Sequence, residues 1–192
     1  TAIAKRLFFE TFKKNLIYIQ VLRSPISLSM IKRIADWSIS IEKIRSRDGH
    51  IKYFQKKTKK NLPYFLKNKS IEYLSANKYE RAIMIIEANL NKETTNLKNF
   101  YNKYKSSEII IPFENLLKDP IKYLDKIRIL LKVKIDRFTF KSIKENNLPR
   151  KFKYLNERQK TIRFLKNKVK KKYFTRLLNL EKFYKNEVLK KF

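Results

Sequence analysis

The chain has 192 residues, of which 48 are Lys or Arg and 17 are Asp or Glu, so its formal net charge at pH 7 is +31. It contains one Gly, which excludes Walker loops, dinucleotide-binding fingerprints and nucleophile elbows within this chain, because each of these needs several glycines. It contains no Cys, which excludes disulfide frameworks, thiol catalysis and Cys-ligated metal sites.

The apolar content is sufficient for a packed core. Hydrophobic residues make up 43% of the chain and aromatic residues 14%, so extensive disorder is not expected, and the length fits one domain or a large part of one. No stretch approaches the roughly 20 apolar residues that a membrane-spanning helix needs, and no signal-peptide pattern is present. We therefore expect a soluble chain without a transmembrane segment, with a cytoplasmic location favoured.

The positive charge has two interpretations. An AT-rich gene would enrich Lys, Asn and Ile throughout, whatever the function. A field of this size would also attract phosphates, nucleic acids and anionic lipids. Because the sequence starts at Thr1 in a helical pattern, we also expect a further part of the protein to precede it.

The first elements predict an anion site. Helical spacing of apolar residues over 2–14 predicts a short helix, and the apolar run 16–22 predicts a strand of a parallel sheet buried on both faces. The run ends at Arg23, Ser24 and Pro25, where Ser24 is suited to cap a helix that begins at Pro25. A strand, an Arg, a tight turn and a helix are typical of anion binding at a helix N-terminus.

The middle of the chain is predicted to be largely helical. Residues 45–68 are expected to form a charged loop and then a short helix. Ser70 is expected to cap the longest helix, with one apolar stripe from Leu74 to Tyr104.

A second buried strand is predicted over 109–113, and we expect it to lie parallel to the strand over 16–22, as its neighbour or near-neighbour in the sheet. Asp119 is expected to cap a helix that has Pro120 in its first turn. The residues expected to face inward from this helix are Ile121, Leu124, Ile127 and Leu131. Alternation of strands with long helices predicts an α/β fold dominated by helix.

The C-terminal segment is the most basic part of the chain. Residues 150–192 carry 16 Lys or Arg and 3 Asp or Glu, yet they keep an apolar helical stripe. We expect residues 1–149 to form a partial α/β domain and 150–192 a basic amphipathic helical segment docked on it. The residues expected to dock it are Leu165, Val169, Tyr173 and Leu177.

Two segments together resemble the sulfotransferases that use 3′-phosphoadenosine 5′-phosphosulfate (PAPS). Residues 18–25, Tyr-Ile-Gln-Val-Leu-Arg-Ser-Pro, look like that family's strand and Arg-x-Pro turn. Residues 109–127, which contain Phe-Glu-Asn-Leu and Lys-Asp-Pro, are similar to its later segment of strand, Tyr-Glu-x-Leu, Asp-Pro and helix, with Phe113 in place of the Tyr. About 85 residues separate the two motifs, which also fits the family.

The resemblance implies a function and a site. It implies the C-terminal part of a P-loop-like three-layer fold that transfers a sulfuryl group from PAPS to a hydroxyl or amine of a small molecule, glycan or protein, without a metal. The N-terminal loop that holds the phosphosulfate would lie upstream, so this fragment alone would be inactive. Arg23 would bind the 3′-phosphate of the donor. The family's phosphate-binding Ser would align with Ile31, so Ser27 and Ser29 are the nearby candidates.

Other residues leave the chemistry open. Glu114 is interpreted as a structural carboxylate that accepts backbone N–H groups, and no catalytic base is assigned.

The alternative function is binding of RNA or DNA in a ribonucleoprotein-type assembly. Lysines interleaved with aromatic residues, as in 151–154 and 170–174, could combine phosphate neutralisation with base stacking.

Overall fold

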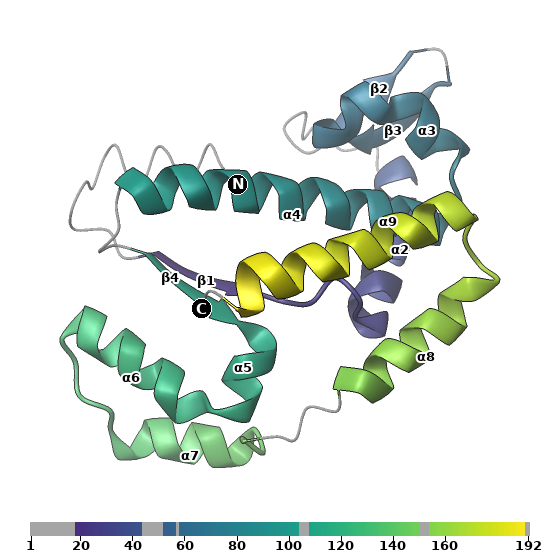
Figure 1. Cartoon of the computed structure of the whole chain (residues 1–192). Helices are drawn as coiled ribbons and strands as arrows, with labels where there is room; N and C mark the ends of the chain where they lie inside the picture. Colours follow the sequence, from purple (N-terminus) through teal and green to yellow (C-terminus); the bar gives the residue numbers. More distant parts are fainter. Residues whose placement is uncertain (1–17, 44–51, 57, 104–107, 150–153, 191–192) are drawn as a thin grey trace. The chain divides into compact units, whose positions relative to one another are not determined.

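The computed structural model describes residues 18–43, 52–56, 58–103, 108–149 and 154–190 (Figure 1). The helix predicted over 2–14 lies outside these residues. The described chain is rich in helix and has four strands, two of which are parallel, in agreement with an α/β class. Among the described residues, no helix is long and apolar enough to span a membrane.

The elements follow one another in this order. They are β1 (Tyr18–Leu22), α2 (Leu28–Lys43), β2 (Lys52–Gln55), β3 (Lys60–Pro63), the 3₁₀ helix η2 (Tyr64–Lys69), α3 (Ser70–Ser75), α4 (Lys78–Lys103), β4 (Glu108–Pro112), α5 (Phe113–Lys118), α6 (Pro120–Leu131), α7 (Arg137–Glu145), α8 (Tyr154–Lys166), α9 (Lys171–Tyr184) and the π-helical turn η3 (Lys185–Leu189).

The chain divides into two compact units. The first unit combines Thr1–Ser24, Lys92–Tyr154 and Phe183–Phe192, and it contains both parallel strands. The second unit combines Pro25–Asn91 and Leu155–Lys182.

The parallel pairing of the two predicted strands is confirmed. β1 and β4 lie side by side (Figure 1), in a register that pairs Tyr18 with Glu108 and Leu22 with Pro112. The prediction that the first strand is buried on both faces is wrong. Gln20 and Leu22 are buried, whereas Ile19 is 39% and Val21 50% exposed. Ile19 and Val21 lie on the same face of β1, so that face is partly open to solvent, whereas both faces of β4 are covered, with Ile110 5% and Ile111 1% exposed.

Helix α2 begins three residues later than predicted. It starts at Leu28, and the carbonyl oxygen of Ser27 accepts a hydrogen bond from the N–H of Ile31 at 2.9 Å. Ser24 is not its cap, because the helix starts four residues further on; the backbone N–H of Ser24 donates to the Glu114 carboxylate in the first unit. The chain therefore turns through Pro25 before the helix starts.

The segment predicted as a loop contains a β-hairpin. β2 and β3 pair antiparallel, with Lys52 opposite Pro63 and Gln55 opposite Lys60. The connection has a left-handed residue at Lys59, φ 53°, a conformation that usually signals Gly or Asn in the sequence. The hairpin was missed because lysine occupies this position.

The helix predicted from Ser70 is two helices. α3 ends at Ser75, and Asn77 then caps α4. The side-chain oxygen of Asn77 accepts from the N–H groups of Tyr79 and Glu80 at 3.0 and 3.1 Å, and Glu80 accepts from the N–H of Asn77 at 2.9 Å. This reciprocal pairing is a capping box with Asn in the first position.

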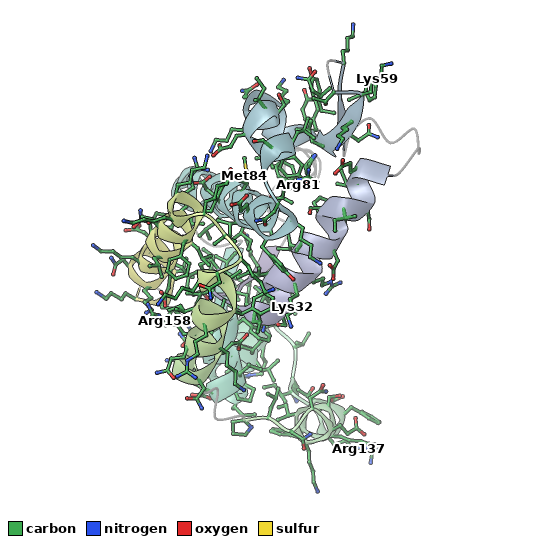
Figure 2. The ribbon with its side chains drawn as sticks, turned by 90° about the vertical axis from the view of Figure 1, so that its right-hand side faces the viewer. Lys32, Lys59, Arg81, Met84, Arg137 and Arg158 are labelled. Carbon is green, nitrogen blue, oxygen red and sulfur yellow. The ribbon has the colours of Figure 1, made fainter. Side chains whose placement is uncertain are left out.

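The first turns of α4 form the centre of the second unit. Every residue from Glu80 to Ile86 is buried, rather than one stripe as predicted. Arg81 is buried with the rest, and it donates to the carbonyl oxygens of Tyr73 and Leu74 and pairs with Glu42. Figure 2 labels Arg81 and Met84 at this point of α4. The Arg81 guanidinium thus adds donors to carbonyl groups near the end of α3, where the carbonyl of Tyr73 also accepts from the N–H of Ala76 at 3.3 Å.

Helix α6 begins as predicted, but the residues that face inward from it differ from the predicted ones. The Asp119 side chain accepts from the N–H of Lys122 at 3.1 Å, and Pro120 opens the helix. Pro120 and Tyr123 are its buried residues, whereas Ile121 is 38% and Leu131 43% exposed. The prediction of Ile121 and Leu131 as inward residues is therefore wrong, because Tyr123 takes the inward position.

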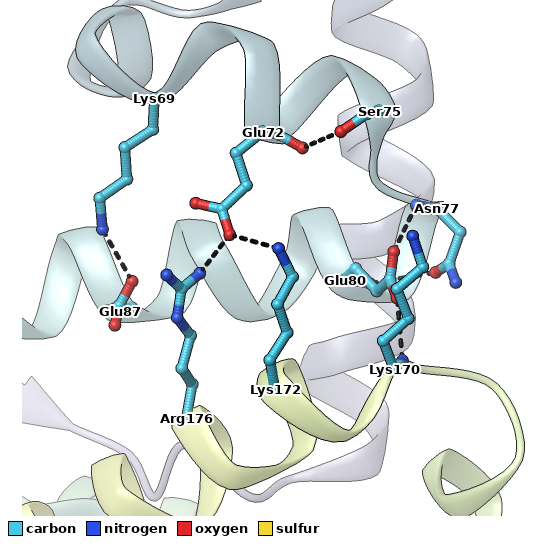
Figure 3. Close-up of polar contacts among 9 residues, drawn as sticks. All are labelled: Lys69, Glu72, Ser75, Asn77, Glu80, Glu87, Lys170, Lys172 and Arg176. Atoms are coloured by element: carbon cyan, nitrogen blue, oxygen red, sulfur yellow. Dashed lines mark hydrogen bonds and ion pairs between the residues drawn. The ribbon is translucent and has the colours of Figure 1, made fainter.

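The basic C-terminal segment is helical over α8, α9 and η3, as predicted. Leu165, Tyr173 and Leu177 are buried in the second unit, and Val169 is half-buried. Figure 3 shows polar contacts that hold the start of α9: Glu72 of α3 binds Lys172 at 3.1 Å and Arg176 at 2.9 Å. Burial raises the pKa of Glu72, but the hydrogen bonds from these two cations outweigh it and keep the pKa below its ordinary value.

Candidate functional site

Arg23 leaves the carboxyl end of β1 beside the carboxyl end of β4. The pairing of Leu22 with Pro112 makes Arg23 and Phe113 the next residues on the two neighbouring strands. The guanidinium carbon of Arg23 lies 4.9 Å from the centroid of the Phe113 ring, and the Nε atom of Arg23 is buried. A guanidinium over an aromatic ring is held in orientation by attraction to the π-face, while its planar donors stay directed outward along the plane.

Glu114 holds this end of the sheet together from the inside. Its side chain is 4% exposed. Oε1 accepts from the backbone N–H of Ser24 at 2.9 Å, and Oε2 lies 2.6 Å from the hydroxyl of Tyr184. The same hydroxyl lies 3.0 Å from the carbonyl oxygen of Leu22, so its single proton can be donated to either acceptor.

These contacts support the interpretation of Glu114 as a structural carboxylate. It joins the end of β1, the start of α5 and the end of α9, which are far apart in the sequence. Both of its oxygens are engaged by protein groups. Glu114 therefore fixes the backbone that follows Arg23.

Ser27 and Ser29 belong to the second unit. The hydroxyl of Ser27 is buried, donates to Glu157 of α8 at 2.8 Å and lies 3.2 Å from the hydroxyl of Ser29, which is exposed. A phosphate bound by Ser27 would first have to displace the Glu157 carboxylate, since two anions repel at this distance. The phosphate-binding roles that the resemblance implies for these two serines remain predictions.

A second group of cations surrounds two aromatic rings in the second unit. Tyr79 and Phe164 pack edge to face with centroids 5.2 Å apart. Lys32 and Lys168 lie over Phe164 at 4.9 and 5.1 Å, and Lys78 lies over Tyr79 at 5.2 Å. We call these five residues the lysine–aromatic cluster. Its members come from α2, α4, α8 and the connection after α8, so no local pattern in the sequence could reveal it.

The lysine–aromatic cluster carries a net positive charge. Lys78 also pairs with Asp36 at 3.2 Å, and the hydrogen bond to Asp36 raises the pKa of Lys78. The cluster thus has three ammonium groups against the one carboxylate of its neighbour Asp36, which leaves a net charge of +2. Like charges gathered at one surface favour a polyanionic ligand.

The aromatic runs that the sequence indicated differ from this cluster. Residues 150–153, which hold most of the first run, lie outside the described chain. In the second run, Tyr173 is buried and Lys172 is paired with Glu72. This run serves the docking of α9 and offers no exposed Tyr173 ring for stacking.

Comparisons with known proteins identify no relative. No protein-family model matches the chain, and no curated protein or solved structure is significantly similar to it. Within the described ranges, no group of three or more His, Cys, Asp or Glu side chains could hold a metal ion. The residues at the ends of β1 and β4 are therefore the candidate functional site of this chain.

The Glu114 contacts predict the effect of one substitution. In Tyr184→Phe the ring still fills its site, but buried Glu114 Oε2 and the Leu22 carbonyl lose a donor. Because an unsatisfied buried acceptor costs about 1 to 3 kcal/mol, we expect a fall of that size in the free energy of unfolding, measured by urea denaturation.

The matched control is Tyr64→Phe, which removes a hydroxyl from a residue that is 47% exposed. We expect it to change the free energy of unfolding by less than about 0.5 kcal/mol. Equal effects of the two substitutions would contradict the role given to Tyr184 and Glu114.

Proposed function

We propose that this chain is the C-terminal part of a PAPS-dependent sulfotransferase with a P-loop-like three-layer fold, in which Arg23 binds the 3′-phosphate of the donor. The observation that carries the proposal is the parallel pairing of β1 with β4. It brings together the ends of the two segments that resemble the family, so that Arg23 lies over Phe113 and Ser24 binds Glu114. The resemblance of the two segments to the family does not by itself say that Arg23 contacts Phe113 or that Ser24 contacts Glu114.

Arg23 suits a phosphate group for physical reasons. A guanidinium stays charged at all ordinary pH values and donates two parallel hydrogen bonds, which match two phosphate oxygens. The Phe113 ring limits the rotation of the side chain, so less conformational entropy is lost when a ligand binds.

Transfer of a sulfuryl group sets further requirements. Cations and aligned N–H groups must stabilise the charge on the donor oxygens, and a base must accept the proton of the acceptor hydroxyl or amine. Arg23 supplies one cation. The phosphosulfate loop is assigned to the part of the protein upstream of this chain, and the base is not assigned.

The test is a titration with nucleotides, made on this chain together with the upstream part that the proposal assigns to the protein. Wild type should bind 3′-phosphoadenosine 5′-phosphate more tightly than adenosine 5′-phosphate, because only the former carries the 3′-phosphate. Since charge-assisted hydrogen bonds contribute about 1.5 to 3 kcal/mol each, Arg23→Ala should weaken binding of the former at least tenfold and remove the preference. Arg23→Lys should restore only part of the affinity that Arg23→Ala loses, because lysine keeps the charge but lacks the two parallel N–H donors of the guanidinium.

The control is Arg163→Ala, which removes the same charge from an exposed position on α8. We expect it to keep the preference for the 3′-phosphate. The proposal fails if wild type binds both nucleotides equally, or if Arg163→Ala and Arg23→Ala weaken binding alike, since binding would then follow overall charge.

A second candidate function is nucleic-acid binding, which the lysine–aromatic cluster favours. Lys32, Lys78 and Lys168 could neutralise phosphates of a single strand, and bases could exchange places with the ammonium groups over Tyr79 and Phe164. The cluster ranks second because Asp36 already neutralises part of its charge.

A triple substitution tests this candidate. Replacing Lys32, Lys78 and Lys168 by Ala should lower the affinity for single-stranded RNA at least tenfold and reduce the slope of log K against log salt by about 2 to 3. The control replaces three exposed lysines elsewhere, Lys118, Lys160 and Lys182, by Ala. Equal losses in both triple variants would show that RNA affinity follows net charge alone.

A further inference from the structure

The end of α6, the helix α7 and the connections on both sides of α7 contribute nothing to the core. From Arg128 to Pro149 every residue is exposed or half-exposed, and α7 has no buried residue. Figure 2 shows side chains radiating from α7, including that of Arg137. A helix without buried contacts gains little from tertiary packing, which normally supplies most helical stability.

Large apolar side chains are concentrated in this exposed segment. Their exposed fractions are 68% for Ile129, 43% for Leu131, 52% for Val133, 60% for Phe138 and 53% for Phe140. We call residues 128–140 the basic–apolar tip. Exposed apolar patches bordered by polar residues mark interaction sites on soluble proteins.

Basic residues alternate with these apolar residues. The tip contains Arg128, Lys132, Lys134 and Arg137, and its single carboxylate is Asp136. Asp136 caps α7, accepting from the N–H of Thr139 at 2.9 Å and from its hydroxyl at 3.0 Å. These hydrogen bonds lower the pKa of Asp136, so it stays ionised in a structural role while the other charges of the tip are positive.

The turn of the tip has a defined backbone. Lys132 has φ 55°, and its N–H and that of Val133 bond to the carbonyl oxygens of Ile129 and Arg128 at 3.4 and 3.2 Å. This is the left-handed ending that commonly closes an α-helix. The exposed positions of Leu131 and Val133 therefore belong to an ordered turn.

We propose that the basic–apolar tip binds the surface of an anionic lipid bilayer. Leu131, Val133 and Phe138 would enter the headgroup region, and Lys132, Lys134 and Arg137 would contact lipid phosphates. The proposal is independent of the sulfotransferase function, because it uses none of the residues at the ends of β1 and β4.

The chemistry of the tip favours lipid over other partners. Aliphatic side chains such as Ile129, Leu131 and Val133 give no advantage on a phosphate backbone, which argues against nucleic acid at this site. Protein interfaces deplete charge at their apolar centre, whereas here cations alternate with apolar residues along the chain. A bilayer surface accommodates both, since lysine and arginine stems lie along apolar groups while their charged ends reach the headgroups.

The first test is vesicle co-sedimentation of the full chain. Vesicles of phosphatidylcholine and phosphatidylserine in a 7:3 ratio should bind the chain, and pure phosphatidylcholine should bind it at least tenfold less. Leu131→Ser with Phe138→Ser keeps the charge and should weaken binding to the mixed vesicles at least tenfold. Ile71→Ser, at a residue 80% exposed in the second unit, is the matched control and should bind as wild type.

The second measurement places the tip directly. The chain has no Cys, so Val133→Cys gives it a single labelling position for an environment-sensitive fluorophore, and Ile71→Cys gives the control. We expect a blue shift with the mixed vesicles for the label at 133 and none for the label at 71.

Three results would overturn the proposal. The serine variant could bind vesicles as wild type does, which would mean that charge alone drives adsorption. The label at 133 could show no shift. Analytical ultracentrifugation could show a wild-type dimer that the serine variant abolishes, in which case a second copy of the chain covers the tip.

Discussion

The carboxylate of Glu114 is the contact on which the arrangement of the first unit depends. It is buried, and it binds the backbone N–H that directly follows Arg23 and the hydroxyl of Tyr184 near the C-terminus. Segments that are distant in the sequence meet at this one side chain. Because a buried carboxylate without partners is very unfavourable, these groups must come together when the chain folds. The orientation of the turn after Arg23 follows from this requirement.

The same principle operates in the second unit. Lys and Arg outnumber Asp and Glu by 48 to 17, so each carboxylate has many possible cationic partners. The core contains few carboxylates. Glu42 binds both Lys60 and Arg81, and Glu72 binds both Lys172 and Arg176. Glu80 accepts from the N–H groups of Asn77 and Lys170. A small number of carboxylates thus joins elements of this very basic chain, and no lysine is buried among the residues that the structure describes.

Features with a local cause were predictable from the sequence. The parallel strands, the Asp119 cap and the burial of Leu165 on α8 and of Tyr173 and Leu177 on α9 follow from apolar runs, capping residues and helical periodicity. The start of α2 was not predictable, because Ser27, the residue directly before it, bonds to Glu157, which lies 130 residues further along the chain. The hairpin was hidden by a lysine at a left-handed turn position. The break before α4 did have a signal in the sequence, because Asn77 and Glu80 have the spacing of a capping box. The long apolar stripe nevertheless favoured one continuous helix.

Hydrogen exchange of backbone amides tests most directly whether the ends of β1 and β4 form the donor site. The measurement compares three states: the protein without ligand, the protein with 3′-phosphoadenosine 5′-phosphate, and the protein with adenosine 5′-phosphate. Binding at Arg23 predicts slower exchange in peptides that cover Leu22–Ser24 and Phe113–Glu114 with the first nucleotide, and little change there with the second. Unchanged exchange in these peptides, or slower exchange spread evenly over the basic surface with both nucleotides, would contradict the proposed site.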